Sequence, residues 1–162
     1  MCKANCCKTY TITVTSFDVQ RICKLGMQPD FAEFAPPKLL SFDPDVVLDF
    51  QDDYRGGILT FKSHPCHFLK DNRCTIHKYA PLSCRRYPYT LMNRMNGRFC
   101  PLPAELLFRI KGADLKKQPL LKELNAYKQI VKLWNKNPGK KEECLGFLLE
   151  KTNLFLGSWG DD

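Results

Sequence analysis

The sequence predicts a single, mainly helical domain with a few short strands. Three observations lead to this expectation. The chain has 162 residues, of which 44% are hydrophobic and 26% charged, as is usual for one globular domain. All of its nine cysteines except Cys144 lie in the first hundred residues. The last third carries helical patterns instead. We therefore expect an irregular cysteine-rich part (residues 1–102), held together by a metal and packed against a helical C-terminal part (residues 103–162).

The N-terminal part begins with a predicted strand and a predicted helix. Residues 9–14 alternate and are rich in β-branched side chains, which indicates a strand. Thr15 with Asp18 three residues later forms a capping box, which predicts that a helix starts here. Gly26 is expected to end this helix, because glycine readily adopts the left-handed conformation found after helix ends.

Short elements are predicted to follow up to residue 103. A second short helix is expected over residues 29–35, and a loop with one helical turn over residues 36–53. Residues 58–61 indicate a strand, and the turn-like residues 70–73 predict a hairpin. The proline-rich stretch over residues 77–103 is expected to be irregular, and therefore to need support other than regular hydrogen bonding.

Two helices are predicted in the C-terminal part. The first is indicated by apolar residues at helical spacing, has Pro119 in its first turn and ends near residues 137–139. These apolar residues are Leu120, Leu124, Tyr127, Val131 and Trp134. The second covers about residues 141–154. We expect both helices to cover the cysteine-rich part and to provide its core.

The compartment decides how the cysteines are interpreted. Apolar runs such as residues 145–149 are too short to cross a bilayer, and residues 1–7 contain no apolar segment that could act as a signal peptide. We therefore expect a cytoplasmic protein with no membrane partner. Thiols stay reduced there, so metal ligation is favoured over a disulfide framework, which remains a third alternative. Cys23 and Cys144 lie in amphipathic stretches and are predicted to be core residues.

The remaining cysteines are candidate metal ligands, and several lie beside turn-forming residues. They are Cys2, Cys6, Cys7, Cys66, Cys74, Cys84 and Cys100. Backbone amides in turns can donate hydrogen bonds to metal-bound sulfurs. The spacing lacks the two close pairs of a zinc ribbon and the dense cysteine run of a bacterial ferredoxin. It also lacks the three-cysteine loop of radical enzymes that use S-adenosylmethionine, and no glycine-rich nucleotide loop is present.

An ordered set of short motifs resembles a known family, the cysteine-cluster proteins described as zinc- or iron-chelating domains. This family includes the YkgJ-like proteins and the flagellin lysine N-methylases. The motifs are Cys6-Cys7, the segment Phe17–Ile22, Cys66-His67-Phe68-Leu69, Cys74-Thr75-Ile76, Cys84-Arg85-Arg86-Tyr87-Pro88 and Cys100. They cover about the first hundred residues. The fullest N-terminal form of the family is C-x2-C-x2-C-C, whereas this chain has C-x3-C-C and lacks one upstream cysteine.

The resemblance implies a metal centre built from the cysteines that lie in these motifs. Zinc ions and 4Fe-4S clusters each take four protein ligands, so some of the thiols would be spare. The adjacent pair Cys6-Cys7 and the wide spacings favour an iron–sulfur cluster, with redox or group-transfer chemistry. The resemblance further implies methyl transfer to a protein lysine as one activity. The alternative is a non-catalytic zinc module that binds a protein or nucleic-acid partner.

Other polar residues near the cysteines each have two interpretations. Arg85 and Arg86 directly follow Cys84, and either donate hydrogen bonds to the bound cofactor or form surface ion pairs. Three histidines are mixed-site zinc ligands or polar surface residues: His64, His67 and His77. No catalytic residue is assigned.

Two runs of charge are expected to be solvated. The basic residues Lys128, Lys132 and Lys136 repeat every four residues along one predicted helix. The acidic residues Asp43, Asp45, Asp49, Asp52 and Asp53 lie in a predicted loop without the spacing of a calcium site. The formal net charge of +8 suggests attraction to acidic partners.

Overall fold

The computed structural model describes residues 4–37, 43–86 and 118–159, and these residues are mainly helical with two small antiparallel sheets. The α-helices are α1 (Asn5–Thr9), α2 (Ser16–Cys23), α3 (Leu82–Arg86), α5 (Gln118–Asn135) and α6 (Lys141–Ser158). The strands are β1 (Ala32–Ala35), β2 (Ile58–Phe61), β3 (Leu69–Lys70) and β4 (Arg73–Cys74). Three short 3-10 helices are η1 (Pro29–Phe31), η2 (Pro44–Val46) and η3 (His77–Tyr79). The expected fold class is confirmed.

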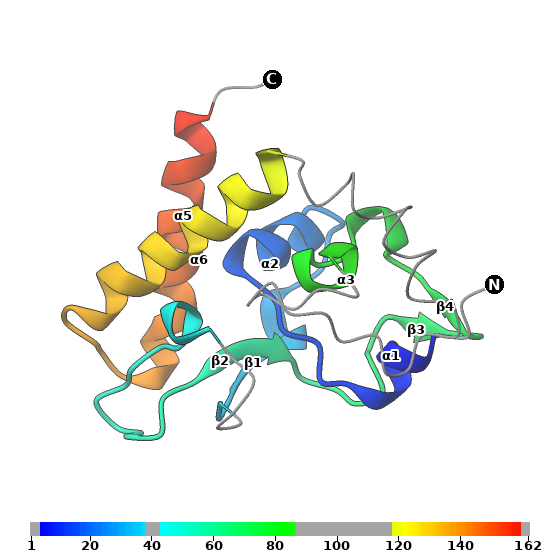
Figure 1. Cartoon of the computed structure of the whole chain (residues 1–162), viewed down its shortest axis with the longest axis horizontal. Helices are drawn as coiled ribbons and strands as arrows, with labels where there is room; N and C mark the ends of the chain where they lie inside the picture. The colour runs from blue at the N-terminus through cyan, green and yellow to red at the C-terminus, as the bar shows by residue number, and fades with distance from the viewer. Residues whose placement is uncertain (1–3, 38–42, 87–117, 160–162) are drawn as a thin grey trace.

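Helix α2 lies at the centre of the molecule. Figure 1 shows the C-terminal helices α5 and α6 on one side of α2, and α1, α3, β3 and β4 on the other. Val19 and Ile22 of α2 are fully buried, in the same core as Ile130 of α5 and Leu148 of α6. The helix therefore connects the cysteine-bearing elements to the C-terminal pair.

The predicted capping box starts helix α2. The Thr15 side chain accepts a hydrogen bond from the Asp18 amide, and the Asp18 carboxylate accepts one from the Thr15 amide. This satisfies amide groups that the first turn of a helix leaves without partners. The helix ends at Cys23, and a short turn leads to Gly26, whose φ of +84° requires the freedom of glycine.

The pairing of β1 with β2 corrects the helix predicted over residues 29–35. Only η1 is helical there, and the following β1 pairs antiparallel with β2, with Ala32 opposite Phe61. All four residues of β2 are buried, so their backbone groups need partners that water cannot supply. Strand pairing therefore overrides the local helical tendency after Pro29.

Residues 9–14 form less strand than expected. Thr9 belongs to α1, and a single bridge pairs Thr13 with Thr60. The segment still runs along β2, because the Val14 amide donates to the Leu59 carbonyl and the Phe61 amide donates to the Ile12 carbonyl. The predicted strand of residues 58–61 is confirmed as β2.

The expected hairpin is confirmed as β3 and β4. Leu69 lies opposite Cys74, and Lys70 lies opposite Arg73. The two turn residues between the strands, Asp71 and Asn72, have φ values of +48° and +60°. Positive φ at both central residues is the geometry that matches the twist of a two-residue hairpin.

Both predicted C-terminal helices are present. The apolar stripe of α5 is buried at Leu124, Tyr127, Val131 and Trp134. Helix α6 continues to Ser158, beyond the predicted end near residue 154. The last turn is stabilised by packing, because the ring of Trp159 stacks on that of Phe17 with a centroid distance of 5.3 Å. Within the described residues, no helix combines the length and apolar character that crossing a membrane requires.

Part of the acidic loop is held against α5 by ion pairs. This corrects the expectation of full solvation for Asp43 and Asp45 in the acidic run and for Lys128 in the basic run. Lys128 of α5 forms ion pairs with Asp43 and Asp45, and Lys132 pairs with Asp45 at 3.5 Å. Burial is the largest single effect and raises the pKa of Asp43. The hydrogen bonds from Lys128 and the Asp45 amide, together with the charges of Lys128 and Lys132, outweigh it, so the pKa lies below its usual value. Lys132 and Lys136 remain exposed, as predicted for the stripe.

Candidate metal centre

Four cysteines from four separate segments meet in the half of the molecule opposite the C-terminal helices. Cys7 lies on α1, Cys66 in the loop after β2, Cys74 at the end of β4, and Cys84 on α3. Cys66 is buried and the other three are half-buried. None of the four is part of a disulfide, and neither are Cys23 and Cys144. The disulfide alternative thus has no support among the described residues.

Cys66 is the centre of this group. Its backbone amide donates to the Cys7 carbonyl at 2.9 Å, and its thiol is hydrogen-bonded to the Cys7 side chain. That side-chain bond lowers the pKa of Cys66, burial opposes it, and the amide of Phe68 lowers the pKa further. The neighbouring Cys84 and Cys74 act in the opposite direction, because nearby thiolates repel a further negative charge. The net effect is a lowered pKa, which favours the thiolate that metals bind.

The other predicted ligands are outside the described side chains. Cys2 and Cys100 lie outside the described residues, while Cys6 and Arg86 are described by their backbones alone, on α1 and α3. Among the side chains that the structure does describe, no three His, Cys, Asp or Glu residues are already arranged to hold one ion. The four described cysteines are close to one another but do not form a completed metal site, so their assignment as ligands stays a prediction.

The donor set fits a thiophilic metal centre. The described donors near Cys66 are thiols, and the amide of Phe68 donates to the Cys66 sulfur, as amides do at metal–thiolate sites. The three histidines are exposed, and the His67 and Phe68 rings form a T-shaped pair. This arrangement suits zinc or an iron–sulfur cluster bound mainly by sulfur, rather than a hard cation such as Mg²⁺.

The position of Cys84 is determined by its neighbours on α3. The Leu82 amide donates to the Asp18 carboxylate at 2.9 Å, and the Ser83 hydroxyl donates to the Thr13 carbonyl at 2.6 Å. On the other side of Cys84, the Arg85 guanidinium donates to Glu123 at 3.2 Å. A five-residue helix is not stable on its own, so these contacts hold α3 in place.

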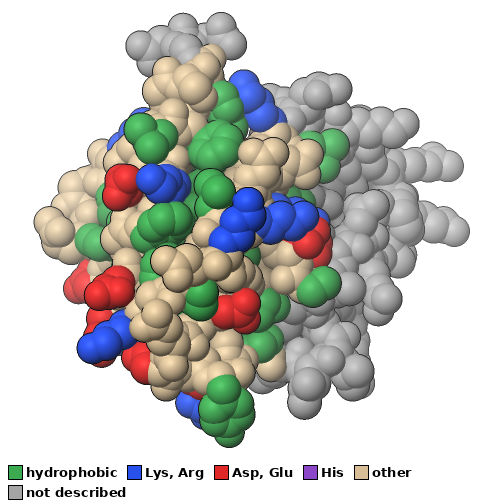
Figure 2. All heavy atoms as spheres, turned by 90° about the vertical axis from the view of Figure 1, so that its left-hand side faces the viewer, with side chains coloured by type: hydrophobic (Ala, Val, Ile, Leu, Met, Phe, Trp, Pro, Cys, Tyr) green, Lys and Arg blue, Asp and Glu red, His purple; other side chains and the backbone are tan. Residues whose placement is uncertain are grey.

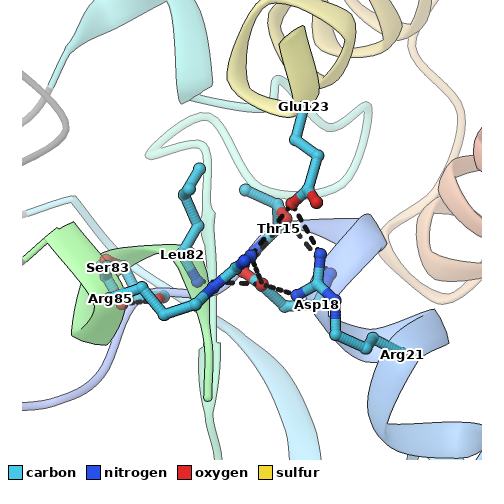
Figure 3. Close-up of polar contacts among 8 residues, drawn as sticks. Thr15, Asp18, Arg21, Leu82, Ser83, Arg85 and Glu123 are labelled. Carbon is cyan, nitrogen blue, oxygen red and sulfur yellow. Dashed lines mark hydrogen bonds and ion pairs between the residues drawn. The ribbon is translucent and has the colours of Figure 1, made fainter. Parts of the chain in front are cut away.

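A charged network supplies two of these contacts (Figure 3). Asp18 is completely buried and, besides the Leu82 amide, accepts hydrogen bonds from Thr15 and from Arg21 at 2.7 Å. Glu123 of α5 accepts from Arg21 at 2.6 Å and from Arg85 at 3.2 Å. The two carboxylates and two guanidinium groups balance in charge, so the buried charge of Asp18 is compensated within this partly buried cluster.

Arg21 is the most strongly held cation of this network. Burial lowers the pKa of Arg21, but the charges of Asp18 and Glu123 and their hydrogen bonds raise it above its usual value. Of the two roles predicted for Arg85, the structure shows the ion pair. Its partner is Glu123 of α5, and the pair is partly buried rather than at the open surface. Its Nε is buried and has no hydrogen-bond partner among the described residues. Donation from Arg85 to a bound cofactor stays a prediction.

The network was not predicted from the sequence. Asp18 was recognised only as a helix cap, and Arg21 only as part of a family motif. Glu123 had no local signal at all, because its partners Arg21 and Arg85 are 102 and 38 residues away in the chain. Only a comparison that detects paired changes at distant positions could have indicated it.

The fold and its group of neighbouring thiols define a cysteine-cluster protein. The family model named CxxCxxCC, "Putative zinc- or iron-chelating domain", matches residues 1–106, and the chain belongs to this family. No curated protein and no solved structure matches the chain. The match confirms the resemblance seen in the motifs and supports metal binding. It ends before α5, so Glu123 lies outside the matched part.

Proposed function

We propose that this protein binds an iron–sulfur cluster of the 4Fe-4S type on its clustered cysteines. The observation that carries the proposal is the proximity of the Cys7, Cys74 and Cys84 thiols to the Cys66 thiol. Cys6, Cys100 and Cys2 are the further candidates for ligands. A cluster with several metal ions suits ligands from widely spaced segments better than one small tetrahedral ion does.

The residues of the chain would give such a cluster a shielded and polar setting. A bound cluster supplies electron transfer or supports group-transfer chemistry. The amide of Phe68 would stabilise charge on the sulfur of Cys66, and burial of Cys66 would limit access of water. Free thiols fit a reducing compartment such as the cytoplasm. The resemblance to flagellin lysine N-methylases suggests methyl transfer to a protein lysine, and hence a protein substrate.

The zinc module is the second candidate, and the size of the cysteine-bearing elements favours it. Helices α1 and α3 have five residues each, and strands β3 and β4 have two each. Elements this short do not persist in water without further support. A structural zinc ion would supply that support, because metal binding contributes directly to folding.

A protein partner is favoured over nucleic acid for either candidate. On the face shown in Figure 2, acidic and basic side chains are interspersed. Lys128, one of the three lysines of the basic stripe, is half-buried in its ion pairs with the acidic loop. Nucleic-acid binding depends on a concentrated basic surface that neutralises phosphates, and these ion pairs reduce the positive charge available.

Metal analysis of protein purified without air tests the proposal. We expect about four irons and four sulfides per chain, with a brown colour that bleaches in air. The variant Cys66→Ser should lose most of the iron, because it removes the central sulfur of the group. The matched variant Cys144→Ser changes a buried cysteine of the core and should keep the iron.

The other outcomes are equally informative. One zinc and no iron per chain would establish the zinc module and contradict the iron–sulfur proposal. A folded protein without either metal, in which all thiols react with a thiol reagent, would contradict both candidates.

A further inference from the structure

Helix α5 contributes directly to the surroundings of Cys84, although it lies outside the part of the chain that matches the family. Glu123 is half-buried on α5 and faces the Arg85 guanidinium (Figure 3). Arg85 follows Cys84 directly on α3. Displacement of the Arg85 side chain would therefore loosen the turn of α3 that carries Cys84.

Asp18 acts on the same helix from the opposite side of Cys84. Its buried carboxylate accepts the amide of Leu82, the first residue of α3. An isolated first turn leaves its amides without partners, and a carboxylate placed there stabilises the helix start. Cys84 thus lies between two fixed points, one at Leu82 and one at Arg85.

Arg21 connects the two carboxylates. It donates to Asp18 at 2.7 Å and to Glu123 at 2.6 Å. Arg85 lies 3.2 Å from Glu123 and 4.0 Å from Asp18. If Glu123 lost its charge, both guanidinium groups would compete for Asp18 and repel each other, and Arg85, the more distant of the two, would move away.

We propose that Glu123 is a positioning residue for Cys84, acting through Arg85, so that helix α5 sets the geometry of one ligand of the metal centre. The inference rests on the proposed function in one respect, since it takes Cys84 to be a ligand. Residues that orient metal ligands commonly change metal affinity by about 10- to 100-fold when they are replaced.

The test compares Glu123→Gln with the parent protein, both purified without air, using iodoacetamide as the probe of each thiol. Glutamine keeps the shape of glutamate and removes its charge. We expect Cys84 to be alkylated several-fold faster in the variant, as read by mass spectrometry, while the rate at the buried Cys144 stays unchanged. A chelator competition with Zn²⁺ should show affinity weakened by about tenfold. The control Glu150→Gln alters an exposed ion pair on α6 and should match the parent in both measurements.

Three results would overturn the inference. An unchanged rate at Cys84 would show that Glu123 does not hold it. Equal acceleration at Cys84 and Cys144 would show a general loss of structure. Faster alkylation of Cys84 with unchanged Zn²⁺ affinity would show that Cys84 is not a ligand. A parent protein that binds neither zinc nor iron would instead contradict the proposed function, while the alkylation rates would still decide whether Glu123 positions Cys84.

Discussion

Two buried cysteines of this protein differ in the protonation state that their surroundings favour. Cys144 on α6 is completely buried, and burial raises its pKa to about 12. Cys66 is also buried, yet its pKa is lowered, because the Cys7 side chain and the Phe68 amide stabilise its thiolate. Burial alone therefore does not determine the pKa of a cysteine in this protein. The hydrogen bonds that reach the sulfur separate Cys66, a predicted ligand, from Cys144.

The raised pKa of Cys144 predicts loss of stability at alkaline pH. Below about pH 9 the thiol is protonated in both the folded and unfolded states. Above that pH the unfolded chain loses this proton and the folded protein keeps it. The free energy of unfolding therefore falls as the pH rises, until the folded pKa of about 12 is reached. Between pH 9 and 10.5, the free energy of unfolding should fall less steeply with pH for Cys144→Ala than for the parent. The difference between the two slopes should be roughly 1.4 kcal/mol per pH unit.

Urea denaturation under reducing conditions at several pH values measures this difference. Cys23→Ala serves as the comparison, because the Cys23 thiol is only half-buried, although burial raises its pKa too. Its effect should be smaller. Parallel pH curves for Cys144→Ala and the parent would show that this thiol does not control the alkaline loss.

At the scale of elements, the cysteine-bearing segments are short and depend on contacts with distant parts of the chain. The β3–β4 hairpin places Cys74 and has a turn in which Asp71 and Asn72 both have positive φ. Asparagine tolerates this conformation, glycine adopts it without strain, and a β-branched residue is strained there. The turn therefore influences where the Cys74 sulfur lies.

Substitutions at Asn72 should change stability in opposite directions. Asn72→Gly should raise the free energy of unfolding by up to about 0.5 kcal/mol, because Asp-Gly is a preferred pair for this turn. Asn72→Val should lower it by about 1–2 kcal/mol. Urea denaturation measures both, with Thr11→Val as an exposed control outside the turn. If Asn72→Val and this control had the same free energy of unfolding, the result would contradict a positive φ at Asn72.

The elements also show where prediction from sequence succeeds. Helix α2, strand β2, the hairpin and the two C-terminal helices were predicted, because each is specified by a capping box, a turn or a periodic pattern within its own residues. Strand β1 was missed because its partner β2 begins more than twenty residues later, at Ile58. Glu123 was missed for the same reason. The group of cysteines was predicted from motifs rather than from geometry.

At the scale of the whole molecule, the loop before β2 joins the N-terminal part to the C-terminal helices. The Asn135 side chain at the end of α5 donates to the Val47 carbonyl at 2.8 Å and accepts from the Asp49 amide at 3.0 Å. The Trp134 indole donates to the Asp49 carbonyl at 2.7 Å. These bonds satisfy backbone groups in a loop that has little regular structure of its own.

Asn135→Ala should therefore destabilise the protein by about 1–3 kcal/mol, because it removes two hydrogen bonds to the backbone of this loop. Alanine has the higher helix propensity, so the loss would not come from the helix itself. The control Asn153→Ala, at an exposed position of α6, should leave stability unchanged or slightly raised. Thermal unfolding of the three proteins at one pH measures the effect. Equal melting temperatures for Asn135→Ala and the parent would contradict the role of this residue.

The buried pair of hydroxyl groups between α2 and α6 has a consequence for how the protein is made. Ser16 and Thr152 are 2.6 Å apart at their oxygens and 136 residues apart in the chain. Both side chains are completely buried. During synthesis, helix α2 cannot be enclosed in its final surroundings until residue 152 has left the ribosome. The thiols emerge earlier, so the nascent chain exposes them while it still lacks much of its core.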